Sequence, residues 1–258
     1  DIDEIDHTNM KKLLLLITGL LLLFSVDGQI LRYSNYTAPA PQAERPDTIG
    51  IIDDIVTSVG VDATSHPIDL PGGLLTGDLI LVFFSCDGNP TVSINTGVSG
   101  EGWTIESYAY GTTAVTGAVI WKISDGTDAL TLTTNQAQVS NTQAYGLYNV
   151  NASDPITVTS ATGASGNPNP PSNTGAYGAV DYLWFAVAAA DSYASLATAG
   201  PADFYGFLAT SINVGGSSSI NSAYRSLNTA GAYDPGTFTI TPTDEQWAAF
   251  TVIVNPAE

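Results

Sequence analysis

Basic residues are scarce in this sequence: 6 lysines and arginines stand against 25 aspartates and glutamates, a formal net charge of −19 over 258 residues. Such a polyanion repels phosphate backbones, which excludes nucleic-acid binding as the main activity. Cysteine occurs once, at Cys86, so no disulfide can form within the chain. The helix formers Lys, Arg and Glu are few, whereas Thr, Val, Ile and Tyr are frequent, and this balance indicates an all-β chain. With 4 Trp, 12 Tyr and 8 Phe, the chain has enough apolar bulk for a packed core.

A hydrophobic run long enough to cross a bilayer is also lacking. The apolar residues 13–24 follow Met10 and two lysines, and the small residues Val26 and Gly28 precede Gln29. This order is typical of a secretory signal peptide cut after residue 28. The run of 12 residues falls well short of the roughly 20 that a membrane span needs, so we expect no stable membrane anchor. A buried helix or an anchor is the alternative interpretation. We predict a secreted, extracellular protein on a cell surface or a virion.

The chain after residue 28 divides into a short N-terminal region and one large domain. Residues 29–37 have the pattern of a short strand, and residues 38–46 form a Pro-rich, extended spacer. Residues 47–258 contain short apolar or alternating runs about every 8–12 residues, with Gly, Asn, Asp and Pro between them. This pattern predicts an antiparallel, jelly-roll-like β-sandwich. The expected strands lie near residues 50–60, 79–86, 91–95, 103–110, 115–123, 129–134, 143–150, 155–160, 180–190, 204–213, 218–227, 237–241 and 246–254.

Two parts of the domain resemble each other at a spacing of 103 residues. The matching pairs are Asp78 with Asp181, Trp121-Lys122 with Tyr224-Arg225, and Gln143 with Gln246. The repeat predicts a sandwich of two similar halves, near residues 77–150 and 180–254. The halves should pack face to face, because neither can bury both of its faces alone. Residues 151–178, rich in Gly, Asn, Ser and Pro, are expected to form a surface loop that joins them.

Several short motifs occur along the domain: Leu70-Pro71-Gly72-Gly73, Thr76-Gly77-Asp78-Leu79-Ile80, Asp87-Gly88-Asn89-Pro90, Gly102-Trp103-Thr104, Trp121-Lys122, Val180-Asp181-Tyr182-Leu183 and Glu245-Gln246-Trp247-Ala248-Ala249. Together they resemble β-sandwich domains of phage virion proteins, such as tail-fibre or capsid accessory modules. The likeness covers about residues 60–256 and implies a structural or adhesive role, with no catalytic residues to carry over. The signal-like leader departs from this pattern, because tail proteins assemble in the cytosol. It leaves open a secreted bacterial relative of the same fold.

Few residues suit catalysis. Cys86 ends an apolar run and has the pattern of a core residue rather than a nucleophile. His66 precedes a proline in a polar turn, without the sequence motif of a serine hydrolase. Glu101 and Glu106 flank Trp103, but residues five apart on a strand point to opposite faces, which argues against a cooperating carboxylate pair. We therefore expect no enzyme, and glycoside hydrolysis is the less favoured alternative.

Calcium is the one cofactor that the sequence leaves open. Asp87 and Asn89 lie in one predicted turn, and Asp125, Thr127 and Asp128 lie in another. Carboxylate and carbonyl oxygens are the ligands that calcium prefers, so these turns are candidate metal sites. The alternative is that they are ordinary Asp-Gly turns, since no EF-hand loop is present.

Aromatic side chains could form a platform for glycans. Trp103, Tyr108 and Tyr110 are the candidate ligand-binding residues, and the spacing of the two tyrosines places them on one face of a strand. Exposed aromatic rings stack on sugars because they offer a flat apolar area with a polar tip. The alternative is that the tryptophans, Trp103 included, fill the core.

Together these features predict a non-enzymatic extracellular or virion-surface protein that assembles or decorates a surface and adheres to glycans. A carbohydrate-binding module or lectin is the alternative. The expected partners are other copies of the chain, other surface or virion proteins, and glycans. Residues 29–37 on their spacer are a candidate assembly arm that adds to a neighbour's sheet edge. The alternative is an N-terminal strand that closes the chain's own sandwich.

Overall fold

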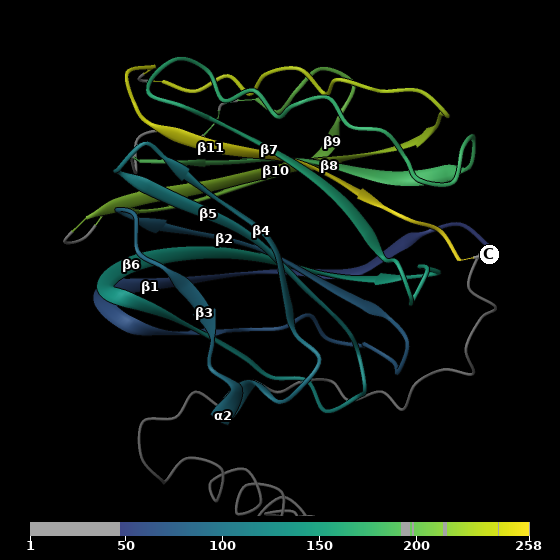
Figure 1. Ribbon diagram of the computed structural model, residues 1–258, viewed down its shortest axis with the longest axis horizontal. Helices are drawn as coiled ribbons and strands as arrows, with labels where there is room; N and C mark the ends of the chain where they lie inside the picture. Colours follow the sequence, from purple (N-terminus) through teal and green to yellow (C-terminus); the bar gives the residue numbers. More distant parts are fainter. Residues whose placement is uncertain (1–46, 192–196, 198, 214–215, 242, 258) are drawn as a thin grey trace, which may run out of the picture. The chain divides into compact units, whose positions relative to one another are not determined.

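The computed structural model describes residues 47–257 except 192–196, 198, 214–215 and 242. The predicted signal peptide (1–28) and the predicted strand and spacer (29–46) lie outside the described residues. The described chain confirms the all-β prediction, because it forms two antiparallel sheets that face each other (Figure 1). Among these residues, no helix has the length and hydrophobicity needed to span a membrane.

The first sheet has the strand order β1-β6-β2-β5-β4, with β3 paired to β6. The second sheet has the order β7-β11-β8-β10-β9. The elements are β1 (Gly50–Ile68), β2 (Leu79–Asp87), β3 (Val92–Ile94), α2 (Thr96–Ser99), β4 (Thr104–Gly111), β5 (Val115–Ile123), β6 (Leu130–Tyr148), β7 (Ile156–Gly163), β8 (Asp181–Ala190), β9 (Tyr205–Asn213), β10 (Ser217–Asn228) and β11 (Trp247–Val254).

The two sheets share an apolar layer formed by their inward side chains. Phe83 of β2 and Tyr145 of β6 meet Phe185 of β8, with ring centroids 5.4 and 4.9 Å apart. Aliphatic side chains such as Leu79 and Val252 surround these rings, and all of them are buried. Such burial stabilises a fold by about 1.5–3 kcal/mol per large apolar side chain. This layer is therefore the main source of contact between the halves.

A line of polar side chains crosses the same interface beside the apolar layer. The amide of Asn141 donates to the hydroxyl and carbonyl oxygens of Ser218, each at 2.9 Å. The hydroxyl of Ser222 donates to Gln143 at 2.6 Å and lies 2.6 Å from the hydroxyl of Tyr145. All five residues are buried, so every one of these bonds replaces a bond to water. Because hydrogen bonds are directional, the line fixes how β6 lies over β10.

Each sheet is also covered on its outer face. On the first sheet, Ile80 and Phe84 of β2 pack against Ile68 and Leu132. These two residues lie at the end of β1 and the start of β6, beyond the register shift of this strand pair, in the far halves of the two strands. Those two strands bend where their register shifts between Val59 and Ser65, and the bend brings their far halves across the sheet (Figure 1). Two-sided burial explains why the central strands are continuous apolar runs rather than alternating ones.

The predicted repeat is confirmed at the level of strands. The order β1-β6-β2-β5-β4 matches β7-β11-β8-β10-β9 strand for strand. The sheets face each other in reverse order, so that β1 lies against β9 and β4 against β7. Two similar units related in this way have an approximate two-fold axis between them.

The spacing of the repeat differs from strand to strand, unlike the uniform 103 residues of the sequence comparison. Trp121 and Tyr224 are equivalent at 103 residues, because both pack on the shared layer. Leu79 and Leu183 are equivalent at 104, since a shift by one residue would turn β8 over. Their partners, Leu147 and Val254, are 107 residues apart. Two of the three matching pairs, at Asp78 and at Gln143, are therefore out of register by one and by four residues.

Some predicted strand boundaries are wrong, and the predicted joining loop 151–178 contains the edge strand β7, which pairs with β11. The segments 129–134 and 143–150 belong to the one long strand β6, whose bend the sequence does not signal. The segment 237–241 forms only an isolated bridge at Thr239. Phe238 and Ile240 alternate as in a strand, but they pack on Ala186 and Ala188 as a cover for the second sheet. Their apolar pattern reports burial on one side, which an extended covering segment produces as well as a strand does.

Gly117 of β5 tests the tightness of the shared layer. A Cβ atom at this position would lie 2.8 Å from the ring of Phe250 and 3.2 Å from Cβ of Ala189, both buried. We expect Gly117→Ala to lower the free energy of unfolding by about 1–3 kcal/mol through overpacking. Urea denaturation measures the loss.

Gly97 in α2 provides the matched control, because its Cβ would meet only the Asn95 side chain, at 3.4 Å. The Gly97→Ala variant should keep wild-type stability or gain slightly. Equal losses in both variants would contradict a tightly packed interface at Gly117.

Candidate functional site

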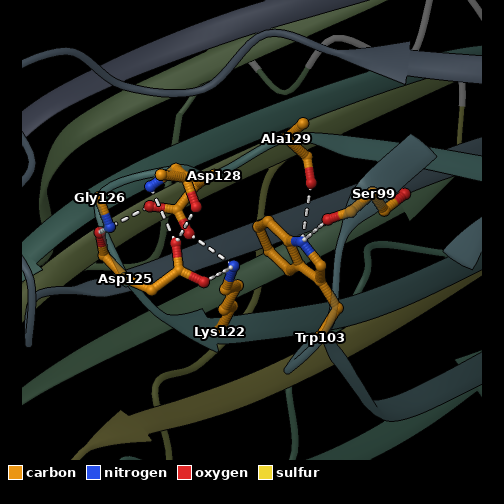
Figure 2. Close-up of polar contacts among 9 residues, drawn as sticks. Ser99, Trp103, Lys122, Asp125, Gly126, Asp128 and Ala129 are labelled. Carbon is orange, nitrogen blue, oxygen red and sulfur yellow. Dashed lines mark hydrogen bonds and ion pairs between the residues drawn. The ribbon is translucent and has the colours of Figure 1, made fainter. Parts of the chain in front are cut away.

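A buried lysine organises the turn that follows β5. Lys122 is 3% exposed, and its Nζ lies 2.9 Å from Oδ2 of Asp125 and 2.8 Å from Oδ1 of Asp128 (Figure 2). The same Nζ lies 5.9 Å from the ring centroid of Trp103, within the range of a cation–π contact. One ammonium group is therefore held by two carboxylates and an aromatic face.

The remaining carboxylate oxygens of this turn also have partners. Oδ1 of Asp125 accepts from the backbone N–H and the hydroxyl of Thr127, both at 2.8 Å. Oδ2 of Asp128 accepts from the hydroxyl of Ser124 at 2.6 Å. The Ser124 hydroxyl in turn accepts from the N–H of Gly126 at 3.2 Å. The turn is a closed network in which both carboxylates serve the lysine and the backbone.

The charges of the network shift the pKa of two of its members. Burial on its own would lower the pKa of Lys122, but hydrogen bonds to Asp125 and Asp128 outweigh it, and the pKa lies above its usual value. The hydrogen bond from Lys122, with those from Thr127, lowers the pKa of Asp125 to about 2. Both groups are therefore charged throughout the ordinary pH range.

The four predicted calcium ligands are not brought together. Asp87 pairs with Val115 at the start of β5, whereas Asp125 and Asp128 follow the end of the same strand. At about 3.3 Å per residue, these positions are more than about 25 Å apart. At Asp125 and Asp128 the ammonium of Lys122 takes the position that a cation would need. Asn89 is exposed beside Asp87, and the described residues contain no group of three or more acidic, His or Cys side chains placed to hold a metal.

Trp103 is a core residue and not part of an exposed platform. It is 9% exposed and packs on the outer face of the first sheet. Its indole N–H donates to the carbonyl oxygens of Ser99, at 3.0 Å, and Ala129, at 2.8 Å (Figure 2). Trp103 therefore ties the end of α2 to the chain that enters β6.

Tyr108 and Tyr110 do form an aromatic pair on the surface. They lie on the edge strand β4, with ring centroids 5.4 Å apart in an edge-to-face arrangement. Tyr108 is 46% exposed, and Tyr110 is partly buried. Desolvation and the neighbouring Tyr108 raise the pKa of Tyr110, so this phenol stays neutral and can donate a hydrogen bond.

His66 and Cys86 are both inaccessible, and the predicted position of His66 in a polar turn is wrong, because it lies on strand β1. His66 is fully buried, with Nε2 3.0 Å from the hydroxyl of Thr134 and Nδ1 2.9 Å from that of Ser140. Desolvation lowers the pKa of His66 to about 4, which keeps the ring neutral. Cys86 is also fully buried, and burial raises the pKa of its thiol, so the thiolate form is disfavoured. Of the two candidate carboxylates, Glu106 accepts from the indole N–H of Trp121 at 3.1 Å.

A group of acidic residues lies at the end of the sandwich where β2 and β8 end. The comparison of the two halves by sequence did not reveal it. Asp191 follows β8 at the position equivalent to Asp87 in the first half, if the 104-residue spacing is used. Desolvation, and then the charges of Asp87 and Glu245, raise the pKa of Asp191 to about 7. The pKa values of Asp87 and Glu245 are also raised, first by desolvation. The corrected repeat spacing is the sequence signal that could have identified Asp191.

No family model matches this chain, and neither does any curated protein or any solved structure. The function therefore has to be argued from the residues themselves.

Replacing Lys122 tests whether the turn is a structural ion network. Lys122→Met would leave the side chain of Asp128, 6% exposed, without a counter-charge. Breaking a buried pair from one side costs about 3–5 kcal/mol of unfolding free energy, and we expect a loss of that size in urea denaturation. Asp125→Asn should cost far less, because this side chain is 55% exposed and water replaces the lost bond. A Lys122→Met variant as stable as the wild type would contradict the network.

Asp191 predicts how stability depends on pH. The folded state holds its proton with a pKa of about 7, against 3.8 for an unperturbed aspartate. Between these values the unfolded chain binds fewer protons than the folded chain, so stability falls as the pH rises. Asp191→Asn should remove this contribution and raise the urea midpoint at pH 8 more than at pH 4.

His66 supplies an internal control with the opposite sign. Its pKa is lowered from 6.5 to about 4, so its contribution to stability is lost as the pH falls through that range. The Asp191→Asn variant should keep this acid-side loss. If the variant and the wild type lose stability in parallel between pH 5 and 8, the raised pKa of Asp191 is wrong.

Proposed function

We propose that this protein is a non-enzymatic component of a bacterial cell surface or a virion surface, which assembles or decorates that surface and adheres to glycans through Tyr108 and Tyr110. The carrying observation is the tyrosine pair on the edge strand β4, where two rings stand together at the surface. The leader, with its signal-like order, supports an extracellular location. The motifs that resemble phage virion domains support the virion setting.

The distribution of reactive side chains supports a non-enzymatic role. The imidazole of His66 and the thiol of Cys86 are fully buried. Lys122 is engaged by two carboxylates, and Glu106 by the indole of Trp121. An active site needs a reactive group that meets its substrate, and these groups are committed to the fold.

Charge narrows the choice of partners. The net charge of −19 disfavours nucleic acids and other polyanions, and it keeps separate copies soluble. Neutral glycans and uncharged protein edges remain suitable partners, because contact with them is made through stacking, backbone bonds and apolar area.

A carbohydrate-binding module or lectin is the second candidate, and the same tyrosine pair favours it. In that function glycan recognition is the whole activity, and no assembly is needed. A glycoside hydrolase is less favoured. It requires two cooperating carboxylates about 5–9.5 Å apart across a cleft, and Glu106 is already bonded to Trp121.

Glycan binding by the tyrosine pair is testable with single substitutions in β4. Tyr108→Ala removes an exposed ring and should weaken binding to a responsive glycan about three- to tenfold, the value of one aromatic contact. Tyr108→Phe keeps the flat ring and should retain most of the affinity. A glycan array identifies the sugar, and calorimetry measures its affinity for each variant.

The fold of each variant is checked by urea denaturation, because Tyr108 lies at the surface and its loss should cost little stability. Trp103→Ala is unsuitable as a test, since that indole anchors α2 and the chain before β6. Saturable binding that is unchanged in Tyr108→Ala and in Tyr110→Ala would place the glycan site elsewhere. No binding to any glycan would leave surface assembly as the only surviving part of the proposal.

A further inference from the structure

The strand β9 is an unusually unprotected sheet edge. Natural edge strands carry charges or prolines that discourage pairing with another chain. The strands at the other ends of the two sheet orders have some protection: β1 contains Asp53 and Asp54, β4 contains Glu106, and the covering segment at Asn173 donates a hydrogen bond to a carbonyl of β7. The further edge strand β3 has only three residues. By contrast, β9 has nine residues, Tyr205–Asn213, without a charge or a proline.

Apolar side chains are exposed along the same edge. Tyr205 is 50% exposed and Phe207 is 39% exposed, both on β9. On β1, which lies against β9, Val56 is 43% exposed. Val56 shares the inward face with Ser58, whose hydroxyl donates to the inward Asn141. A further strand beside β9 would cover apolar area on both faces of the sheet.

The described chain begins close to this edge. Thr48 and Ile49 line a small hollow together with Ser226 and Leu227 of β10. The backbone N–H of Ser226 donates to the hydroxyl of Tyr205, 3.1 Å away, at the start of β9. Thr48 and Ile49 therefore lie at the end of the sandwich where β9 begins.

We propose that residues 29–37 of a second copy of this chain add to β9 as a new edge strand. This inference deepens the assembly part of the proposed function and rests on it. The sequence QILRYSNYT has nine residues, as β9 has, and it offers apolar side chains on both faces: Ile30 and Tyr36 on one, Leu31 and Tyr33 on the other. In strand addition, backbone hydrogen bonds supply affinity and alternate side chains supply specificity.

Charge complementarity supports this occupant. Arg32 is the only charged residue in the segment, and it shares a face with Ile30 and Tyr36. Asp54 on β1 lies near Tyr224, whose pKa its negative charge helps to raise after desolvation and the neighbouring Tyr205. The ring of Tyr224 is 4.8 Å from that of Tyr205 on β9. An arginine on the added strand would meet an acidic residue at this edge.

The spacer favours a second copy over the same chain. Residues 38–46 include three prolines, and a Pro-rich segment of nine residues extends to about 28 Å, close to the length of β9 itself. Since β9 begins next to the start of the described chain, the segment could reach its own β9 only by reversing direction within the spacer. Addition to another copy needs no reversal, and it produces either a reciprocal dimer or an open chain of subunits.

The first test is a matched pair of proline substitutions in the full chain. Leu31→Pro removes a backbone donor from the predicted strand and blocks strand addition. Ala40→Pro adds a proline to the spacer and leaves the strand intact. Light scattering after size exclusion should show multimers for the wild type and for Ala40→Pro, and a mass lower by about twofold or more for Leu31→Pro. A monomeric wild type, or multimers that persist in Leu31→Pro, would overturn the inference.

The second test identifies the contact and distinguishes the two copies. Tyr33→Cys chains and Phe207→Cys chains are diluted, mixed and reconcentrated, then treated with a bismaleimide. Cys86 is fully buried with a raised pKa, so it should not react. Cross-linked pairs of one chain of each kind are expected. A further sample carries both substitutions in one chain. If cross-links form only in this sample, and only within single chains, the segment adds to the chain's own sandwich and the inference is overturned.

Glycan binding separates this inference from the proposed function. Leu31→Pro leaves Tyr108 and Tyr110 in place, so its affinity per chain for the array-identified glycan should equal that of the wild type. If Leu31→Pro remains assembled while Tyr108→Ala loses binding, the arm inference fails and the adhesion proposal stands. If instead Leu31→Pro fails to assemble while Tyr108→Ala binds the glycan as the wild type does, the arm inference stands and the adhesion proposal fails.

Discussion

The apolar layer between the two sheets is the interaction on which the rest of the structure depends. The rings of Phe83, Tyr145 and Phe185 contact one another across it, so the side chains that close one half belong to the other. Each half presents an inward face that only the other half covers. Folding of the two halves is therefore coupled, and a substitution in this layer weakens both at once. Apolar contact alone is non-directional and would allow one sheet to slide over the other. The directional hydrogen bonds of Asn141 and Gln143 to β10 fix the relative position of the two sheets.

The segments that cover the outer faces of the two sheets limit which surfaces are accessible to a partner. On the first sheet the bent strands β1 and β6 provide the cover, and on the second an extended segment around Phe238 does so. Broad sheet faces, which many β-proteins use for binding, are thus occupied by the chain itself. Among the described residues, the edges at β4 and β9 are ones where no covering segment has been identified. This is why the tyrosine pair of β4 and the uncharged strand β9 are the features from which recognition and assembly can be argued.

Sequence reasoning predicted the fold class and the repeat because both leave a signal in apolar spacing. It failed where the role of a side chain depends on which group it contacts in the folded chain, because the spacing of apolar residues does not show such contacts. Asp125 and Asp128 have the composition of a calcium turn, and only the inward-folded Lys122 shows that they hold an ammonium group instead. The sequence groups Trp103 with Tyr108 and Tyr110 as a candidate platform because all three are aromatic, yet its indole N–H donates to two backbone carbonyls in the core. Asp191 was missed because a uniform spacing of 103 residues places it one position away from its true equivalent.

The facing of β1 with β9 and of β4 with β7 has a consequence for ancestry. In this arrangement both units use the same surface to contact each other, as the two identical chains of a homodimer do around a two-fold axis. A chain of half the length would find its missing partner in a second copy of itself, and joining the two genes end to end would need only a short connection such as residues 149–155, between β6 and β7. The two units of this chain are no longer identical. One carries β3 and α2, the other carries its extended cover, and the spacing between equivalent residues ranges from 103 to 107.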